Sequence, residues 1–275
     1  MDTESVLKKG NVAVVTGAAD GIGLAAAARF AEFGMQVCMV DVNQKALDSA
    51  ADGVNPAMSV AADVADIDAM RSLKDRVIAE LGQVNVLMNN AGTGGGNNCW
   101  TDYEVWQKTL NTNLWGVING VQAFTEAMLD NRSPGLIINT GSKQGITAPP
   151  GNPAYNVSKA GVKSFTEALA HSLRTLEGCQ LSAHLLVPGF TYTGMIRAFL
   201  PEQPAAAWSA DQVVSFMLER IEAGDFYILC PDNDVDRALD NKRMEWAMGD
   251  LIHNRPALSR WHPEFADEYN AFEQS

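Results

Sequence analysis

The sequence predicts an α/β fold in which a parallel sheet is covered by helices on both faces. Short, nearly continuous apolar runs recur along the chain, a helical pattern follows most of them, and 275 residues suffice for one large domain. Strands that are apolar on both sides belong to a sheet buried on both faces. Right-handed crossovers then give a doubly wound fold, with ligand sites at the carboxyl ends of the strands.

The elements alternate regularly, and we expect the chain, 1–275, to form a single domain. Strands are predicted at 12–16, 36–41, 57–63, 84–90, 136–140, 181–187 and 226–230. Helices are predicted at 22–33, 43–52, 66–81, 102–130, 153–177 and 210–223. Residues 231–275 form a C-terminal extension, in which an acidic helical stretch precedes a segment rich in prolines and aromatics. The sequence leaves it open as a lid, a packing arm or a subunit contact.

The composition argues against several kinds of partner. The formal net charge is −13, and an acidic chain repels nucleic-acid phosphates and anionic lipid. No segment approaches the ~20 uninterrupted apolar residues of a membrane span. The four cysteines form no CxxC pair and have no histidine at metal-ligand spacing. We therefore expect no nucleic-acid or membrane partner, no metal site, and a location in the reducing cytoplasm.

The segment TGAADGIG, 16–23, lies directly between the first strand and the first helix. Gly17 allows a tight turn, Gly21 lets backbone approach a pyrophosphate, and Gly23 lets the helix pack on the sheet. The helix N-terminus then offers free N–H groups and a positive dipole end to the phosphates. An ordinary turn is the alternative, but the position between strand and helix favours a dinucleotide site.

Asp41, which ends the second strand, indicates which dinucleotide binds. Its carboxylate can accept hydrogen bonds from both ribose hydroxyls and would repel a 2′-phosphate. Asp20 stands where a basic residue would help to hold that phosphate, and Lys45 is the only cation nearby. We therefore predict NAD rather than NADP. In the alternative interpretation, Asp41 only caps the second helix.

Two further strand ends are candidates for cofactor contact. Asp63 and Val64 follow the third strand and could contact the adenine edge, although the spacing fits a helix cap at Asp63 nearly as well. NNAG, 89–92, closes the fourth strand with small residues that let a flat dinucleotide lie across the sheet. GTGGGNN, 92–98, lacks the P-loop pattern, so we interpret it as a flexible rim.

The stretch NTGSKQGITAPPGNPAYNVSK, 139–159, contains the reactive side chains. A hydrolase nucleophile would sit in a GxSxG turn, but around Ser142 the glycine positions hold Thr140 and Gln144. An acid and a histidine in the required later order are also hard to place. The pattern therefore favours Tyr155 as the reactive group.

Tyr155 and Lys159 are predicted to share one helix face. Asn152 and Pro153 are typical of an N-cap and a first helical position, which puts Tyr155 in the first turn and Lys159 one turn later. A nearby ammonium and the positive helix end favour the phenolate. Tyr155 can then act as a general acid/base, with the Ser142 hydroxyl holding the substrate oxygen. A chance surface Tyr–Lys pair is the alternative.

Together, TGxxxGxG, NNAG, NLWGV, YNVSK, PGFTYT and the serine of SKQG resemble the classical short-chain dehydrogenase/reductase family, over about residues 8–230. The resemblance implies a Rossmann-type fold with seven parallel strands. It makes Tyr155 the acid/base, while Lys159 lowers its pKa and binds the nicotinamide ribose. Ser142 orients the substrate oxygen, and Asn113 holds a water that links the lysine to solvent.

The resemblance also implies that the segment from Pro188 to Thr193 contacts the nicotinamide end of the cofactor. The cofactor contacts that we predict are Gly17, Asp20, Gly21, Ile22, Gly23, Asp41, Asp63, Val64, Asn90, Ala91, Gly92, Tyr155, Lys159, Pro188, Gly189, Thr191 and Thr193.

Departures from the family pattern bear on the substrate rather than on the reaction. Gly141 stands where many members carry a serine, and Lys143 and Gln144 replace small apolar residues. The segment after Thr193 is short and suggests a modest lid. Its apolar side chains fit a hydrophobic pocket and plain packing equally well; they are Met195, Ile196, Phe199, Leu200 and Trp208.

These patterns predict an NAD-dependent oxidoreductase that interconverts a secondary alcohol and a ketone. The alternatives are a carbonyl reductase acting on a bulky hydrophobic or aromatic ketone, and a non-catalytic NAD-binding sensor. By family resemblance, the apolar faces of helices 102–130 and 153–177 predict a homodimer or homotetramer. The sequence does not identify the substrate.

Overall fold

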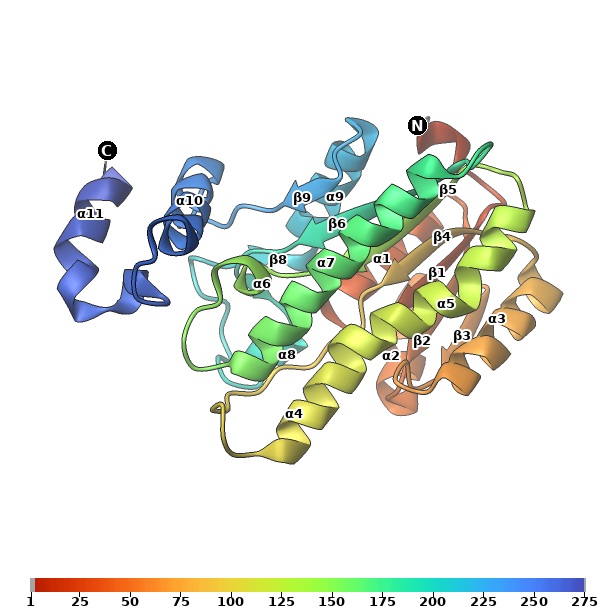
Figure 1. Cartoon of the computed structure of the whole chain (residues 1–275). Helices are drawn as coiled ribbons and strands as arrows, with labels where there is room; N and C mark the ends of the chain where they lie inside the picture. Colours follow the sequence, from red (N-terminus) through yellow and green to blue (C-terminus); the bar gives the residue numbers. More distant parts are fainter. Residues whose placement is uncertain (1–2, 275) are drawn as a thin grey trace.

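The chain folds as three layers, α/β/α, around a seven-stranded sheet (Figure 1). The structure is a computed structural model that describes residues 3–274. Every strand pair is parallel, in the order β3-β2-β1-β4-β5-β6-β9. The strands are β1 (Val12–Thr16), β2 (Gln36–Asp41), β3 (Met58–Ala61), β4 (Val84–Asn89), β5 (Gly135–Thr140), β6 (Leu181–Val187) and β9 (Tyr227–Leu229). The predicted Rossmann-type, doubly wound fold is confirmed.

Helices cover both faces of the sheet because each buries one apolar stripe against it. On one face lie α1 (Gly21–Glu32), α2 (Gln44–Val54) and α9 (Ala210–Glu222), whose buried side chains include Phe30, Leu47 and Met217. On the other lie α3 (Ile67–Leu81), α5 (Gly116–Asp130) and α7 (Pro153–Thr175), nearest the viewer in Figure 1. No helix within residues 3–274 is long and apolar enough to span a membrane.

The single helix predicted at 102–130 is interrupted by a π segment. α4 (Tyr103–Leu110) runs into a π turn, Asn111–Trp115, and then into α5. The Gly116 N–H donates to the Asn111 carbonyl, five residues back. An apolar pattern does not reveal such a change in hydrogen bonding, and π turns of this kind often mark functional sites.

Several short elements were not predicted because they span only two to four residues. They are α6 (Gln144–Thr147), α8 (Gly194–Arg197) and the two-stranded sheet of β7 (Thr191–Tyr192) and β8 (Trp208–Ser209). Pro153 opens α7 as expected. Asn152 occupies the N-cap position as predicted, although its side chain makes no capping hydrogen bond.

The extension packs on itself and against the sheet end that carries α6 (Figure 1). It contains α10 (Arg237–His253), two 3₁₀ turns (Ser259–Trp261 and Pro263–Phe265) and α11 (Ala266–Gln274). Trp246 lies at the centre of the extension, where its side chain is 4% exposed and packs on two aromatic rings of α11. The Arg255 guanidinium lies 4.0 Å from the centre of the Trp246 ring. Met244 packs into the core beside β6 and β9.

Candidate active site

The turn between β1 and α1 approaches other backbone so closely that two glycines are required. Gly17 has a φ of +65°, and a Cβ on it would lie 2.7 Å from the Ala91 Cα. A Cβ on Gly23 would lie 2.2 Å from the Gly17 carbonyl oxygen. α1 therefore begins tightly against the sheet, with its N–H groups and positive dipole end at the carboxyl edge. This arrangement suits a bound pyrophosphate.

Asp41 fastens this turn to the end of β2. Its Oδ2 accepts a hydrogen bond from the Ala19 N–H at 3.2 Å, and its Oδ1 accepts one from the Asn43 N–H at 3.0 Å. Asn43 is the residue that caps α2, so the interpretation of Asp41 as only a helix cap is wrong. The carboxylate also reaches the wall of the large cavity described below.

Asp63 and Val64 do not occupy the positions that were predicted for them at the end of the third strand. β3 ends at Ala61, and Asp66 caps α3, so the alternative of a cap at Asp63 is wrong. The Val64 side chain is buried against Gly116. Neither residue lies on the cavity wall, and their contact with a cofactor stays a prediction.

Two threonines outside the predicted set support the floor of the site. Thr16 Oγ1 accepts hydrogen bonds from the N–H groups of Asn90 and Ala91, at 2.9 and 3.1 Å. The Thr140 hydroxyl donates to Asn90 Oδ1 at 3.2 Å. Both threonines end strands, which is the sequence signal that could have identified them.

One cavity of about 590 Å³ follows the carboxyl edge of the sheet. Five predicted residues are not on its wall: Gly23, Asp63, Val64, Ala91 and Asn113. The wall includes the other predicted residues, namely Gly17, Asp20, Gly21, Ile22, Asp41, Asn90, Gly92, Ser142, Tyr155, Lys159, Pro188, Gly189, Thr191 and Thr193. The fold thus gathers most of the predicted set around one space. The described residues, 3–274, contain no group of three or more side chains suited to hold a metal ion.

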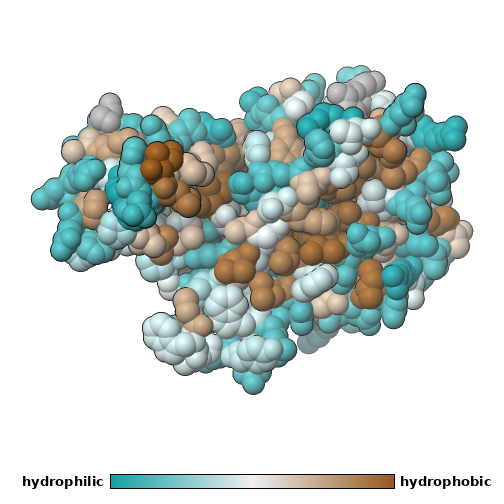
Figure 2. Space-filling view, viewed as in Figure 1, coloured by the Kyte–Doolittle hydropathy of each residue, from teal (hydrophilic) through white to brown (hydrophobic). Residues whose placement is uncertain are grey.

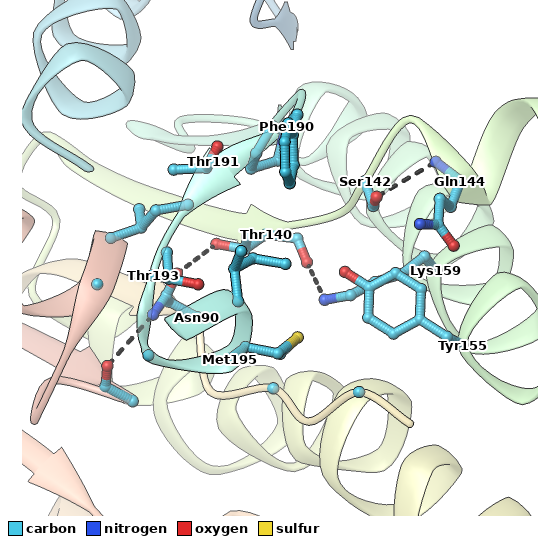
Figure 3. Close-up of a pocket in the computed structure, with 18 of the residues that line it drawn as sticks. Asn90, Thr140, Ser142, Gln144, Tyr155, Lys159, Phe190, Thr191, Thr193 and Met195 are labelled. Atoms are coloured by element: carbon cyan, nitrogen blue, oxygen red, sulfur yellow. Dashed lines mark hydrogen bonds between the residues drawn. The ribbon is translucent and has the colours of Figure 1, made fainter. Parts of the chain in front are cut away.

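Ser142, Tyr155 and Lys159 meet inside this cavity (Figure 3). The Ser142 side chain lies close enough to the Tyr155 hydroxyl to lower the pKa of the phenol. Lys159 Nζ donates to the Thr140 carbonyl oxygen at 2.8 Å and lies 5.6 Å from the centre of the tyrosine ring. Ser142 Oγ also accepts a hydrogen bond from the Gln144 N–H at 3.2 Å. The alternative that Tyr155 and Lys159 form a surface pair by chance is therefore excluded.

Burial controls the pKa values of these groups. Loss of hydration raises the pKa of Tyr155, and the hydrogen bond with Ser142 offsets part of that increase. Loss of hydration also lowers the pKa of Lys159 to about 8. Desolvation is the largest cause, so the net pKa of Tyr155 is raised in the protein alone, and a lowering of this pKa by the Lys159 ammonium stays a prediction.

Asn113 lies in the π segment and is fully buried. Its Oδ1 accepts from the Thr93 N–H at 2.7 Å, and its Nδ2 donates to the Thr93 carbonyl at 2.9 Å and to Ser158 Oγ at 3.2 Å. A Cβ on Gly92 would lie 3.5 Å from Asn113 Oδ1 and 3.7 Å from Lys159 Nζ. The asparagine therefore holds the loop after β4 beside the lysine.

The chain after β6 returns across the cavity toward the phosphate turn. The Thr191 hydroxyl donates to the Gly189 carbonyl at 3.2 Å. Thr193 approaches the turn so closely that a Cβ on Gly21 would lie 2.9 Å from its Cβ. Thr193 and Met195 face the cavity opposite Tyr155 (Figure 3).

Comparison with known proteins agrees with this arrangement. A family model described as short chain dehydrogenase matches residues 11–204. This chain belongs to the short-chain dehydrogenase family. Among curated proteins, a 1-deoxy-11-beta-hydroxypentalenate dehydrogenase of Streptomyces exfoliatus is 31% identical over 260 residues, which cover 90% of this chain and 93% of that protein.

Two other proteins resemble this short-chain dehydrogenase over much of its length. A 3-oxoacyl-[acyl-carrier-protein] reductase FabG of Thermotoga maritima is 34% identical over 200 residues, 71% of this chain and 79% of the relative. The crystal structure of a short-chain dehydrogenase/reductase from Burkholderia phymatum in complex with NAD has a TM-score of 0.81 at 30% identity. The match covers 90% of this chain and 96% of the Burkholderia phymatum chain.

In this short-chain dehydrogenase, an ion pair that the sequence did not predict lies at the phosphate turn. Arg197, at the end of α8, pairs with Asp20, a residue 177 positions earlier. Asp20 also accepts a hydrogen bond from the Gly21 N–H at 2.5 Å and so caps α1. A carboxylate here would oppose a pyrophosphate, and the guanidinium neutralises it.

Arg197→Gln is expected to raise the Kd for NADH about threefold to fivefold, since a half-exposed pair is worth up to ~1 kcal/mol. The unpaired Asp20 would then repel the pyrophosphate. Adding Asp20→Asn should restore the affinity. Fluorescence titration with NADH at low salt measures both effects, because salt screens exposed charges. Equal Kd values in the wild type and the single variant would contradict this role of the ion pair.

Lys159→Met is expected to make unfolding less dependent on pH. The lysine pKa is about 8 in the folded chain and ordinarily 10.5, so between these values the unfolded chain binds more protons. The stability of the wild type therefore rises with pH in this window, relative to the variant. Urea unfolding at about pH 7 and about pH 9.5 measures the change. A pH-independent difference would show that the lysine titrates normally in the folded protein.

Proposed function

We propose that this short-chain dehydrogenase uses NAD to interconvert a secondary alcohol and a ketone. The continuity of one cavity, from the Asp41 carboxylate to Ser142, Tyr155 and Lys159, carries the proposal. The phosphate turn and Asp41 fit a dinucleotide, whose nicotinamide would supply the acceptor or donor of hydride. One relative is named as a dehydrogenase of a hydroxylated compound and another as a reductase of a 3-oxo compound.

The proton transfer is the part of the reaction that the chain's own residues perform. The Ser142 hydroxyl, which lies beside Tyr155 on the cavity wall, would hold the substrate oxygen next to the phenol. In oxidation, Tyr155 takes the proton of the substrate hydroxyl; in reduction, it donates a proton to the same oxygen. Lys159, held at the Thr140 carbonyl, keeps a positive charge near the ring and stabilises the phenolate.

The raised pKa of Tyr155 favours a second candidate, a carbonyl reductase. A phenol that keeps its proton at neutral pH is ready to donate it to a developing alkoxide, which is the reductive direction. The two candidates share every residue and differ in the direction of net turnover.

The cavity presents several large apolar side chains, which support a neutral, bulky substrate. Its wall carries Phe190, Met195, Ile196 and Phe199. Lys143 is on the wall as well, but two carboxylates hold its ammonium. This environment would bury an apolar ring system more readily than a carboxylate.

A screen of neutral secondary alcohols with NAD⁺, and of the matching ketones with NADH, tests the proposed function by the change in NADH absorbance. Turnover of cyclic or aromatic members of the panel would support it. Tight NAD binding without turnover of any member would overturn the enzymatic proposal in favour of a sensor.

We also propose a homo-oligomer that acts in the cytoplasm. Apolar side chains gather over α5 and α7 in Figure 2, and Trp115 and Val157 are 53% and 49% exposed. Such a surface is more typical of a subunit contact than of a monomer. The four cysteines are free thiols, as is usual in a reducing compartment. Light scattering tests the oligomeric state.

A further inference from the structure

Lys143, the residue after Ser142, is held by two acids of the C-terminal extension. Its Nζ lies 2.7 Å from Asp240 Oδ2 and 3.5 Å from Asp232 Oδ2. The lysine side chain is 18% exposed, and the two acids are 7% and 6% exposed. Charges this far from solvent interact much more strongly than a surface ion pair does.

This three-residue cluster connects the catalytic loop to the turn after β6. Asp232 Oδ2 also accepts a hydrogen bond from the Phe190 N–H at 3.1 Å, and its Oδ1 accepts one from the Val235 N–H at 2.9 Å. The Lys143 N–H donates to the Pro188 carbonyl at 3.4 Å. Lys143 thus joins the loop that carries Ser142, the turn beside the nicotinamide end and the start of the extension.

The cluster depends on its single cation. Two carboxylates face one ammonium. Burial raises the pKa of Asp240, while the hydrogen bond and the charge of Lys143 lower it. Arg243 and Arg260 line a small cleft beside Lys143 and Asp240, and Arg243 is paired with Glu273 at 3.3 Å within the extension. Without the lysine ammonium, two buried like charges would repel each other and push α10 away from the loop.

We propose that Lys143 is a positioning residue that, through Asp232 and Asp240, makes the C-terminal extension part of the active site. The extension holds the Lys143 side chain, the Lys143 N–H donates to the Pro188 carbonyl, and the N–H of the next residue, Gln144, donates to the Ser142 hydroxyl. The inference rests on the proposed function, because it gives Ser142 the task of orienting the substrate oxygen. It also assigns a task to Lys143, which replaces a small apolar residue of the family pattern.

Lys143→Met tests the cluster, and Lys143→Met with Asp240→Asn tests its charge balance. We expect the single variant to lose about tenfold or more in kcat, because a small misplacement of a positioning group has effects of this size. The Kd for NADH should stay within about twofold, since the phosphate turn is untouched. The double variant should recover part of the lost kcat, and Lys143→Arg most of it.

Lys163→Met is the matched control. Lys163 pairs with Glu167 at 2.8 Å on the outer face of α7, and both side chains are about one-third exposed. This substitution removes a lysine–carboxylate pair whose two residues are not on the cavity wall. We expect its kcat to equal that of the wild type.

Hydrogen exchange followed by mass spectrometry gives a readout that needs no turnover. In the Lys143→Met and Asp240→Asn variants, residues 141–148 and 231–245 should exchange faster together, while the phosphate turn keeps its protection. Faster exchange confined to the extension, or an unchanged kcat in an active enzyme, would overturn the inference. If the wild type turns over no alcohol or ketone but both segments still exchange faster in the variants, the contact between the extension and the Lys143 loop is supported and the proposed reaction is wrong.

Discussion

Tyr155→Phe is expected to lower kcat by about a thousandfold, within the 10²–10⁴-fold range of general acid–base catalysis, while NADH binds as before. The phenol is buried beside Ser142, so the substitution removes the proton carrier and little else. Phenylalanine keeps the ring that packs beside Lys159. Steady-state assays on a substrate found by the screen measure kcat, and NADH fluorescence measures the Kd for NADH.

Tyr103→Phe is the control for this experiment. Tyr103 lies at the start of α4 and is 68% exposed, so its loss should change neither kcat nor affinity. If the Tyr155 variant kept wild-type turnover, another group, such as the Lys159 ammonium, would have to carry the proton. The proposed mechanism would then be wrong.

The second large effect concerns the choice of cofactor. NADPH is expected to bind at least about 100-fold more weakly than NADH, because placing like charges together at a binding site costs several kcal/mol. The Asp41 carboxylate is fixed at the end of β2 by two backbone N–H groups and cannot easily turn away from a 2′-phosphate. Asp41→Asn removes the charge with little change in shape, so it should reduce the ratio of the two Kd values.

Asp63→Asn serves as the matched control for Asp41. Asp63 is an acid after the neighbouring strand, but it is not on the cavity wall, so its replacement should leave the ratio unchanged. Titration of each variant with NADH and NADPH measures the ratio of the two Kd values. Tighter binding of NADPH by the wild type would refute the assignment of NAD from Asp41.

The central fold could be predicted because each strand is a short apolar run between polar boundaries. β1, β2 and β6 begin and end at the predicted residues. β3 is shorter than predicted, since Ala62 and Asp63 leave the sheet after pairing ends at Ala61. Helix ends were less certain, because propensity changes gradually where capping decides the boundary.

The arrangement of the candidate site was predictable for a different reason. Tyr155 and Lys159 are four residues apart in one helix, so their relation is local, and Ser142 follows a strand whose end the fold brings to them. The partners of Asp20 and Lys143 are not local. Arg197 and Asp240 lie far along the chain, and their contacts depend on how α8 and α10 pack. A single sequence carries no signal for such pairs.

The π turn at Asn111–Trp115 has a consequence for how this helix can change in evolution. Each residue advances an α-helix by about 100°, and the π turn accommodates one residue more than an α turn. Thr109 before it and Val117 after it are both buried, and residues eight apart fit one core-facing stripe of a helix. Removing one residue here would convert the π turn into an ordinary α turn, so α4 and α5 could keep their packing while the direction of the Asn113 side chain changed. A deletion at this point would therefore alter the site more than the core.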